Sequence, residues 1–307
     1  MNPLYHQPVL RSACIDGLKI KPKGIYLDLT FGGGGHSRAI LERLGSSGRL
    51  IAFDQDASAA HQSSQFAEDN FEFVAANFRH FKKYLKLYGV KQVDGLLADL
   101  GVSSYQIDTP ERGFSTRFSA QLDMRMNAKT IRTAREVLNE SNEEQLHRIL
   151  GQYGEVKNAK TLAQAIIRWR TQHSLETTDD LLQVLTPYAP RGRSYKYFAQ
   201  VFQALRIEVN DELKALEEML LDTPEIIRPG GRLVILSYHS LEDRLVKNFI
   251  QKGKFHGEVE KDLFGHYYTP FQAVNRKPIS ASDEEIAQNN RARSAKLRIA
   301  ERTANEQ

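Results

Sequence analysis

Short apolar segments alternate with longer amphipathic segments over the first hundred residues of the chain. The apolar segments predict strands at 25–30, 49–54, 71–75 and 93–100, and the amphipathic segments predict helices near 36–44, 56–68 and 78–88. This alternation is typical of a parallel sheet covered by helices. We therefore expect a doubly wound α/β fold.

A helical block interrupts the alternation. Residues 101–129 have no periodic apolar face, and apolar positions at i, i+3 and i+4 then predict helices at 133–138, 143–150, 159–170 and 178–185. A helix over about 197–221, a strand over 232–238 and a helix opening at Ser240 restore the sheet pattern. The predicted domains are a discontinuous sheet domain, 1–105 and 201–307, and a helical insertion, 106–200.

Four glycines separate the first predicted strand from the first helix, in Asp28-Leu-Thr-Phe-Gly-Gly-Gly-Gly-His36. An open α/β sheet binds its ligand at this place, and glycines allow the backbone to approach a ligand closely. An ordinary tight turn is the alternative. Asp54 favours binding, because it ends the second strand, where an acid accepts hydrogen bonds from both ribose hydroxyls.

The same pattern distinguishes between two nucleoside cofactors. The dinucleotide motif needs a third glycine where this chain has Ser37 or Arg38. Asp28 instead matches the acid-x-x-x-Gly-x-Gly pattern of class I methyltransferases, in which the acid holds the amino group of the methionine moiety. S-adenosylmethionine is therefore favoured over NAD. The alternative for Asp54 is a helix N-cap, for which Asp56 is better placed.

Candidate chemistry follows the fourth and fifth strands. Asp99 ends the fourth strand, and methyl transfer to nitrogen needs an acceptor for the amine hydrogens, a role that a carboxylate can fill. A loop cap is the alternative for Asp99. His239 and Ser240 follow the fifth strand and are expected at the same edge, where they would position a substrate base. For Ser240, an N-cap with Asp243 at N3 is equally compatible.

Composition changes this picture only locally. The 307 residues carry 42 Lys and Arg against 38 Asp and Glu, which permits an anionic partner without requiring one. Residues 107–206 hold the whole excess, and the aromatic-rich stretch within them has four basic residues and no acid: Arg191, Arg193, Lys196 and Arg206. Single-stranded RNA binding uses this combination, although a solvated helix face over core aromatics also fits. Arg291, Arg293, Lys296 and Arg298 form a second basic run near the last strand.

Cys14 is the only cysteine, so neither a disulfide nor a cysteine metal cluster can form, and no metal site is predicted. Methylation of a pyrimidine ring carbon generally needs a cysteine nucleophile, and Cys14 lies before the first strand, away from the fourth-strand loop. Methylation of an exocyclic amine needs no cysteine nucleophile. The chain has neither a secretory signal pattern nor a long apolar run, so we expect a cytoplasmic protein without a membrane partner.

Seven blocks along the chain together resemble one family. They are Tyr26-Leu-Asp-Leu-Thr-Phe-Gly-Gly-Gly-Gly-His-Ser37, Asp99-Leu-Gly-Val-Ser-Ser104, Glu111-Arg-Gly-Phe-Ser115, Leu122-Asp-Met-Arg-Met126, Phe202-Gln-Ala-Leu-Arg-Ile-Glu-Val-Asn-Asp-Glu-Leu213, Ser237-Tyr-His-Ser-Leu-Glu-Asp-Arg244 and Arg291-Ala-Arg-Ser-Ala-Lys-Leu-Arg298. In this order they resemble the RsmH (MraW) family of bacterial 16S rRNA (cytosine-N4)-methyltransferases. The chain departs from the family pattern at 196–201 and at Asn290, which affects the expected substrate contacts.

The resemblance implies a class I, Rossmann-like fold with an inserted helical subdomain for RNA recognition. It implies S-adenosylmethionine-dependent methylation of the N4 amine of a cytidine in the decoding region of 16S rRNA. Its substrate would be rRNA or an assembled small subunit, and a homodimer is compatible because family members resemble dimers. The implied cofactor contacts come from Gly34, Gly35, His36, Asp54, Phe78, Asp99 and Gln106. Phe78 would lie near adenine or in the core, and Gln106 would bind the methionine end or satisfy a loop backbone.

Two other functions remain open from the residues alone. Methylation of DNA or protein by the same fold fits the cofactor motifs but leaves the basic insertion unexplained. The second alternative is a non-catalytic RNA-binding assembly factor with a vestigial pocket. The presence of Asp28, Asp54 and Asp99 argues against it.

Overall fold

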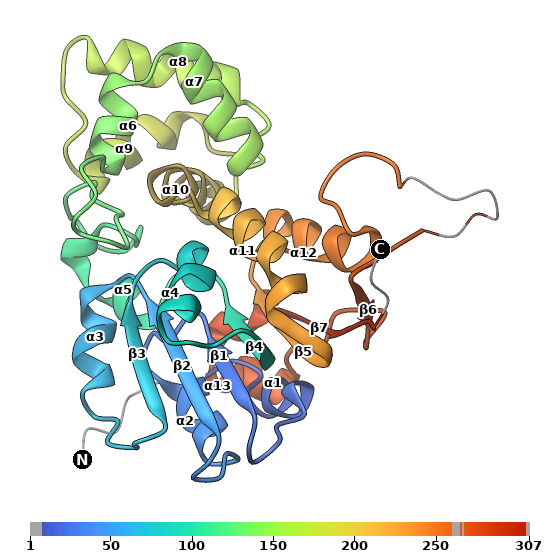
Figure 1. Ribbon diagram of the computed structural model, residues 1–307. Helices are drawn as coiled ribbons and strands as arrows, with labels where there is room; N and C mark the ends of the chain where they lie inside the picture. Colours follow the sequence, from blue (N-terminus) through green and yellow to red (C-terminus); the bar gives the residue numbers. More distant parts are fainter. Residues whose placement is uncertain (1–7, 260–264, 266, 305–307) are drawn as a thin grey trace. The chain divides into compact units, whose positions relative to one another are not determined.

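The computed structural model describes residues 8–259, 265 and 267–304 (Figure 1). The chain divides into two compact units. One, here called the sheet unit, comprises Met1–Gly101 and Lys214–Gln307, and the other, the helical unit, comprises Val102–Leu213. Each is described by itself below.

A seven-stranded sheet, ordered β3-β2-β1-β4-β5-β7-β6, forms the sheet unit. Its strands are β1 (Ile25–Asp28), β2 (Arg49–Asp54), β3 (Phe71–Ala75), β4 (Val93–Asp99), β5 (Ile227–Ser237), β6 (Phe271–Ala273) and β7 (Lys296–Arg302). The first five are parallel, and β7 runs antiparallel to both β5 and β6. The predicted α/β fold with a mostly parallel sheet is confirmed.

The direction in which strands are added reverses at β1, which pairs with β2 on one side and β4 on the other. Ligands of open α/β sheets bind at this switch point, outside the carboxyl ends of the strands. Asp28, Asp54 and Asp99 end β1, β2 and β4, so the topology brings three carboxylates to one edge of the sheet.

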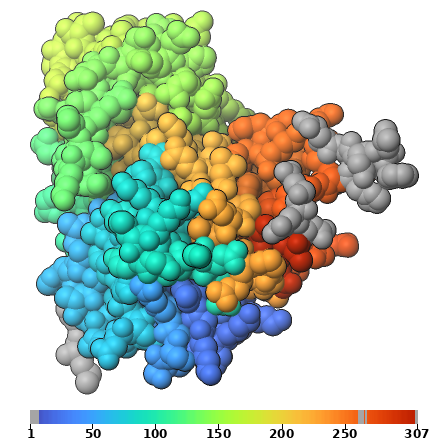
Figure 2. All heavy atoms as spheres, viewed as in Figure 1, coloured from blue at the N-terminus to red at the C-terminus, as the bar shows by residue number. Residues whose placement is uncertain are grey.

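Helices cover the sheet. In this unit they are α1 (Arg11–Leu18), α2 (Gly35–Leu41), α3 (Ala57–Ser63), η1 (Phe78–His80), α4 (Phe81–Leu87), α12 (Ser240–Lys252), α13 (Asp283–Gln288) and η5 (Asn290–Ser294), with α11 (Glu212–Ile226) entering from the helical unit. The helix α1 packs on β4, β5 and β7. Arg79 and Lys82 pair with Glu218 and Asp222 of α11, and Figure 2 shows the teal surface of α4 against the amber surface of α11.

The helical unit is built around its own apolar core. Its elements are α5 (Ser104–Asp108), η2 (Pro110–Arg112), α6 (Ala134–Glu140), α7 (Glu143–Arg148), η3 (Ile149–Tyr153), α8 (Ala159–Arg170), α9 (Thr178–Leu185), η4 (Thr186–Tyr188) and α10 (Ser194–Asn210). Capping boxes at Ser103, Thr133, Asn142 and Thr177 open α5, α6, α7 and α9, because each N-cap oxygen satisfies an otherwise unpaired N–H.

Two predicted element boundaries, one at residue 211 and one at the start of the fifth strand, were wrong. The helix expected over 197–221 is two helices, because Asp211 adopts a left-handed conformation (φ 52°) and its N–H bonds back to Ile207. The fifth strand begins at Ile227 rather than 232, and its pairing with β4 shifts at an irregularity opposite Val93, in a segment where Gly230 has φ 76°.

Within the part of the chain that the structure describes, no helix combines the length and apolar character needed to cross a membrane. The same residues contain no group of three His, Cys, Asp or Glu side chains suited to a metal ion.

Candidate functional site

Asp28 lies beneath the glycine loop with its side chain fully buried. Its Oδ1 accepts from the Thr30 N–H at 3.2 Å, and its Oδ2 accepts from the Ser37 hydroxyl at 2.6 Å. Burial raises the pKa of Asp28, and the hydrogen bond from Ser37 opposes this shift. Since Thr30 precedes the glycines and Ser37 follows them, Asp28 holds the two ends of the loop together.

Gly34 is required by the geometry of the loop. It adopts φ 78°, and a Cβ at this position would lie 2.6 Å from Cζ of Phe66 and 2.8 Å from Cζ of Phe31. Any other residue would therefore meet both backbone strain and two aromatic rings. At Gly35 a Cβ would lie 2.8 Å from Cγ of Pro8.

His36, in the first turn of α2, has a side chain with two buried nitrogens. Neither Nδ1 nor Nε2 has a hydrogen-bond partner among the residues that the structure describes. Nε2 lies 3.4 Å from Oδ2 of Asp99. A buried polar group without a partner is costly, so His36 indicates a polar ligand at this edge of the sheet.

Asp54 accepts hydrogen bonds from two backbone N–H groups. Its Oδ2 accepts from Gly32 at 2.8 Å, and its Oδ1 accepts from Asp56 at 2.9 Å. Burial raises the pKa of Asp54 to about 6, and the two N–H groups partly offset this rise. The helix α3 is capped by Asp56, whose Oδ1 accepts from the Ser58 N–H, as the sequence predicted. Each oxygen of Asp54 retains a lone pair for a further donor.

Phe78 opens the short helix η1 directly after β3 and is partly buried. The preceding Asn77 donates to Oε1 of Gln55 at 2.9 Å, and its own side-chain oxygen accepts from the Arg79 N–H. This bridge ties the ends of β2 and β3 together, and it places Phe78 at the carboxyl edge of the sheet.

Asp99 ends β4, and each of its carboxylate oxygens faces another side chain. Its Oδ1 accepts from the Tyr238 hydroxyl at 2.7 Å, and its Oδ2 faces Nε2 of His36. The Asp99 backbone N–H donates to the Thr30 hydroxyl at 2.6 Å, which fixes the end of β4 to the loop after β1. The side chain is 23% exposed, so a substrate can reach it. The sequence reasoning missed Tyr238, although it lies in the block that contains His239.

The beginning of α12 differs from the expectation for Ser240. The N-cap is His239, whose Nδ1 accepts from the Glu242 N–H at 3.4 Å, while Glu242 Oε2 accepts from the N–H groups of Tyr238 and His239. The N3 residue is therefore Glu242, one position before Asp243, because the helix begins with Ser240 as its first residue. His239 and Ser240 thus lie at the start of α12, with His239 engaged in capping.

Cys14 lies closer to this site than the sequence suggested. The helix α1 packs under the sheet, so the fully buried thiol comes within electrostatic range of Asp99 and Asp28. Burial, followed by these two carboxylates, raises the pKa of Cys14 well above its ordinary value. A buried, protonated thiol is a poor nucleophile, so the argument against ring-carbon chemistry holds for a different reason.

In the helical unit, Gln106 completes the capping box of α5. Its Oε1 accepts from the Ser103 N–H at 2.9 Å, and the Ser103 hydroxyl oxygen accepts from the Gln106 N–H at 3.2 Å. Of the two roles expected for Gln106, the structure shows the one in which it satisfies a loop backbone.

Three of the four basic residues predicted for RNA contact are exposed: Arg191, Arg193 and Lys196. The neighbouring Tyr195 is 84% exposed, whereas Tyr197 belongs to the core. The fourth, Arg206, donates to both carboxylate oxygens of Glu212, at 2.8 and 3.0 Å, and is therefore engaged within its own unit. The sequence did not predict this pairing, because Glu212 lies beyond the helix break at Asp211.

The net charge of the helical unit is smaller than that of residues 107–206, because the unit ends at Leu213. The helical unit extends to Leu213 and includes three acids beyond residue 206, which leave 15 Lys and Arg against 14 Asp and Glu. Two of these acids form ion pairs: Glu208 pairs with Arg148 and Arg132, and Glu212 pairs with Arg206. Positive charge is therefore a local property of the segment 191–196 and not of the whole unit.

The second basic run, 291–298, also contains both ion-paired and exposed residues. Arg298 donates to both oxygens of Asp243, at 2.7 and 3.1 Å, and Lys296 lies 3.6 Å from the same carboxylate. Arg293 is exposed and Arg291 is partly buried, both in η5. The run therefore offers one clearly exposed cation, Arg293.

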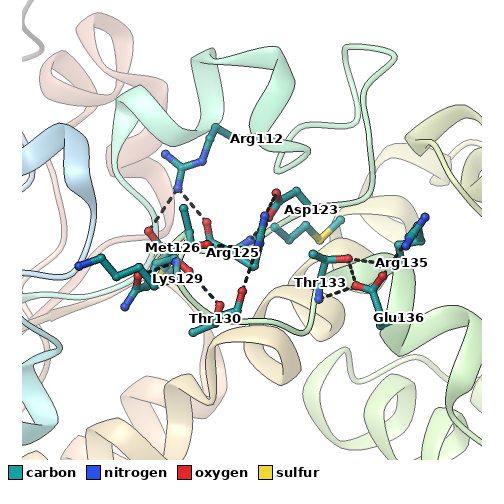
Figure 3. Close-up of polar contacts among 12 residues, drawn as sticks. Arg112, Asp123, Arg125, Met126, Lys129, Thr130, Thr133, Arg135 and Glu136 are labelled. Atoms are coloured by element: carbon teal, nitrogen blue, oxygen red, sulfur yellow. Dashed lines mark hydrogen bonds and ion pairs between the residues drawn. The ribbon is translucent and has the colours of Figure 1, made fainter.

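Arginine side chains order the segment between residues 111 and 136, for which no regular structure was predicted before 133 (Figure 3). Arg112 donates to the carbonyls of Arg125 and Met126, and Arg125 donates to both oxygens of Asp123 and to the carbonyls of Ala128 and Thr130. Although burial opposes it, the hydrogen bonds from Arg125 lower the pKa of Asp123. These contacts give the loop a defined shape without helix or strand.

Comparisons with known proteins agree over almost the whole chain. The model of a family described as the MraW methylase family matches residues 3–303. The protein named "Ribosomal RNA small subunit methyltransferase H" of Cytophaga hutchinsonii is 58% identical over 299 residues, which cover 97% of this chain and 100% of that protein. The protein of the same name from Flavobacterium johnsoniae is 53% identical over 298 residues, which cover 97% and 98% of the two chains.

Proposed function

Because the chain belongs to the MraW methylase family, we propose that it methylates the exocyclic N4 amine of a cytidine in the decoding region of small-subunit (16S) rRNA, with S-adenosylmethionine as methyl donor. The relatives' names support a small-subunit rRNA methyltransferase. The observation that carries the choice of an amine is the partly exposed carboxylate of Asp99 at the sheet edge, beside a thiol that is buried and protonated.

The residues at this edge fit the proposed cofactor. S-adenosylmethionine carries a positive sulfonium, an amino group and two ribose hydroxyls, and the edge offers three carboxylates and a buried imidazole without a partner among the described residues. Asp54 would accept from the ribose hydroxyls, His36 and the glycine loop would contact the polar end, and Phe78 would cover adenine. Asp28, which is fully buried, supports the loop in this proposal.

When bound, S-adenosylmethionine supplies an electrophilic methyl group: the N4 lone pair forms the N–C bond, the S–C bond breaks with its electrons kept by sulfur, and one N4 proton is released. Asp99 would accept a hydrogen bond from the N4 amine, which turns the lone pair toward the methyl group. The same carboxylate, or water beside it, would take the released proton. His239 supports the loop through its capping contact with Glu242.

The exposed segment 191–196 would bind the RNA strand. Its cations, Arg191, Arg193 and Lys196, are suited to phosphates, and the exposed ring of Tyr195 is suited to stacking on a base. Arg293 would add a further phosphate contact from η5. The proposal includes a homodimer and a cytoplasmic location, where small ribosomal subunits are found.

The decisive test is the position of the transferred methyl group. The protein is incubated with methyl-labelled S-adenosylmethionine and with 16S rRNA or small subunits from cells that lack the activity. Mass mapping of nucleosides should place the label on N4 of a cytidine in the decoding region. Label on a ring carbon, on protein alone, or on added DNA in preference to rRNA would contradict the proposal.

Neutralising the basic segment should weaken RNA binding without affecting the cofactor. The triple variant Arg191→Gln, Arg193→Gln, Lys196→Gln is expected to bind rRNA about tenfold or more weakly and to reduce the slope of log K against log salt by about 2. The dissociation constant for S-adenosylmethionine, measured by calorimetry, should stay within about twofold.

A matched control removes three exposed lysines of the sheet unit: Lys23→Gln, Lys83→Gln and Lys91→Gln. It lowers the net charge by the same amount, so it should leave the RNA affinity nearly unchanged. Equal losses in both triple variants would mean that the segment 191–196 has no special role.

A further inference from the structure

Tyr238 connects the end of β5 to the start of α12, and its hydroxyl donates to Oδ1 of Asp99 at 2.7 Å. The two residues are 139 positions apart in the chain, and the parallel pairing of β4 with β5 brings their strand ends together. Within the part of the chain that the structure describes, it is the one hydrogen bond between Asp99 and another side chain.

The tyrosine is held in place independently of Asp99. Its backbone N–H donates to Oε2 of Glu242 at 2.9 Å, and its ring packs against the apolar cluster that includes Cys14. Gly101 lies beside the ring, where a Cβ would be in ordinary van der Waals contact with Cδ2 of Tyr238 at 3.6 Å. The hydroxyl therefore has a fixed place from which to donate.

The direction of this hydrogen bond is set by the surroundings. Burial, followed by the negative charge of Asp99, raises the pKa of Tyr238 well above its ordinary value. The phenol therefore stays protonated and acts as a donor. Its bond uses one lone pair of Oδ1, and Oδ2, which faces His36, can accept from a substrate amine.

We propose that Tyr238 is a positioning residue for methyl transfer, which fixes the Asp99 carboxylate with Oδ2 toward the N4 amine. This inference rests on the proposed function for its catalytic consequence, but the hydrogen bond itself can be tested apart from activity. The titratable groups that interact with the Asp99 carboxylate come from α1, β1, α2 and the connection from β5 to α12: Cys14, Asp28, His36 and Tyr238.

The test is Tyr238→Phe, which removes the hydroxyl and keeps the ring. We expect kcat to fall about tenfold or more, with the KM values for S-adenosylmethionine and rRNA within about twofold. Because the ring and its packing are kept, a fall in kcat at unchanged KM would come from the lost hydrogen bond to Asp99.

Tyr26→Phe is the matched control. Tyr26 is fully buried in β1, and its hydroxyl accepts from the Lys21 N–H at 2.8 Å, so the substitution also removes a tyrosine hydrogen bond in the sheet unit. It should lower the melting temperature while leaving kcat and both KM values nearly unchanged. If Tyr238→Phe behaves in the same way as Tyr26→Phe, the positioning role is overturned.

A second readout separates this inference from the proposed function. With ¹³C-labelled aspartate, the carboxyl resonance of Asp99, assigned by its loss in Asp99→Asn, should have a different chemical shift at pH 7.5 in Tyr238→Phe than in the unsubstituted protein and in Tyr26→Phe. If this shift occurs but rRNA receives no methyl group, the positioning contact stands and the proposed function fails. If the resonance does not shift, the inference fails whatever the activity.

Discussion

Asp99→Asn is expected to lower kcat for rRNA methylation by about 10²- to 10⁴-fold, the range over which a positioned acid or base contributes. The amide keeps the side-chain volume and an oxygen that can accept from Tyr238. It replaces the oxygen that faces the substrate amine with a second N–H donor. The N4 hydrogens would then meet a donor instead of an acceptor, and no group at that position would take the released proton.

Single-turnover methylation with saturating cofactor and rRNA measures this effect directly. Asp94→Asn is the matched control, because Asp94 lies near the other end of β4, is buried, and accepts from the Ile25 N–H at 3.0 Å. That variant should lose stability but keep kcat within a few-fold. Retention of kcat by Asp99→Asn would show that another group orients and deprotonates the amine.

The strands and the acids at their ends were predictable because they depend on local sequence. The four strands predicted before residue 100 are confirmed, since short β-rich runs bounded by turn residues occur at each of them. The distinction between Asp54 and Asp56 was also predictable, because helix capping depends on a residue's distance from the first turn and Asp56 immediately precedes α3.

Elements whose stability depends on distant contacts were missed. The helix α1 has eight residues between two residues of positive φ, and its apolar side chains acquire their role by packing on β4, β5 and β7. The three-residue strand β6 exists because it pairs with β7. Neither segment is long or periodic enough to be recognised alone, and the position of Cys14 near Asp99 followed from the first of them.

Contacts between side chains of different strands also could not be predicted from the sequence. Tyr238 contacts Asp99 because β4 and β5 are neighbours in the sheet. The order of strands in the sheet could not be predicted from the sequence. Arg206 resembled a free cation because Glu212 lies beyond a helix break that was not predicted. The local sequence thus identified the residue types at the site, and the tertiary structure decided which of them are available.

Asp54→Asn should weaken S-adenosylmethionine binding by about 10²-fold at pH 7.5, because two charge-assisted hydrogen bonds to the ribose are lost. The amide has a single oxygen for the N–H groups of Gly32 and Asp56, so the glycine loop also loses one bond. Calorimetric titration of the cofactor measures the change. Asp56→Asn is the matched control, since asparagine caps a helix as well as aspartate, and its affinity should stay within about threefold.

The same site should make cofactor affinity depend on pH. In the free protein, burial raises the pKa of Asp54 from its ordinary value of 3.8 to about 6. Ribose hydroxyls donate to the charged form, so the affinity should be constant well above pH 6 and fall by up to about tenfold per pH unit below it. Asp54→Asn should remove that slope, whereas Asp56→Asn should retain it.

Stability of the cofactor-free protein should show the opposite dependence. A carboxyl group whose pKa is higher in the folded than in the unfolded state binds its proton more tightly when folded, so its stabilising contribution is present below pH 4 and is lost as pH rises toward 6. The difference in urea-unfolding free energy between Asp54→Asn and the unsubstituted protein should therefore change across pH 4–6 and be level above it. A difference that is constant over this range would mean that Asp54 titrates in the folded protein as it does in the unfolded chain, and that the pH dependence of cofactor binding has another origin.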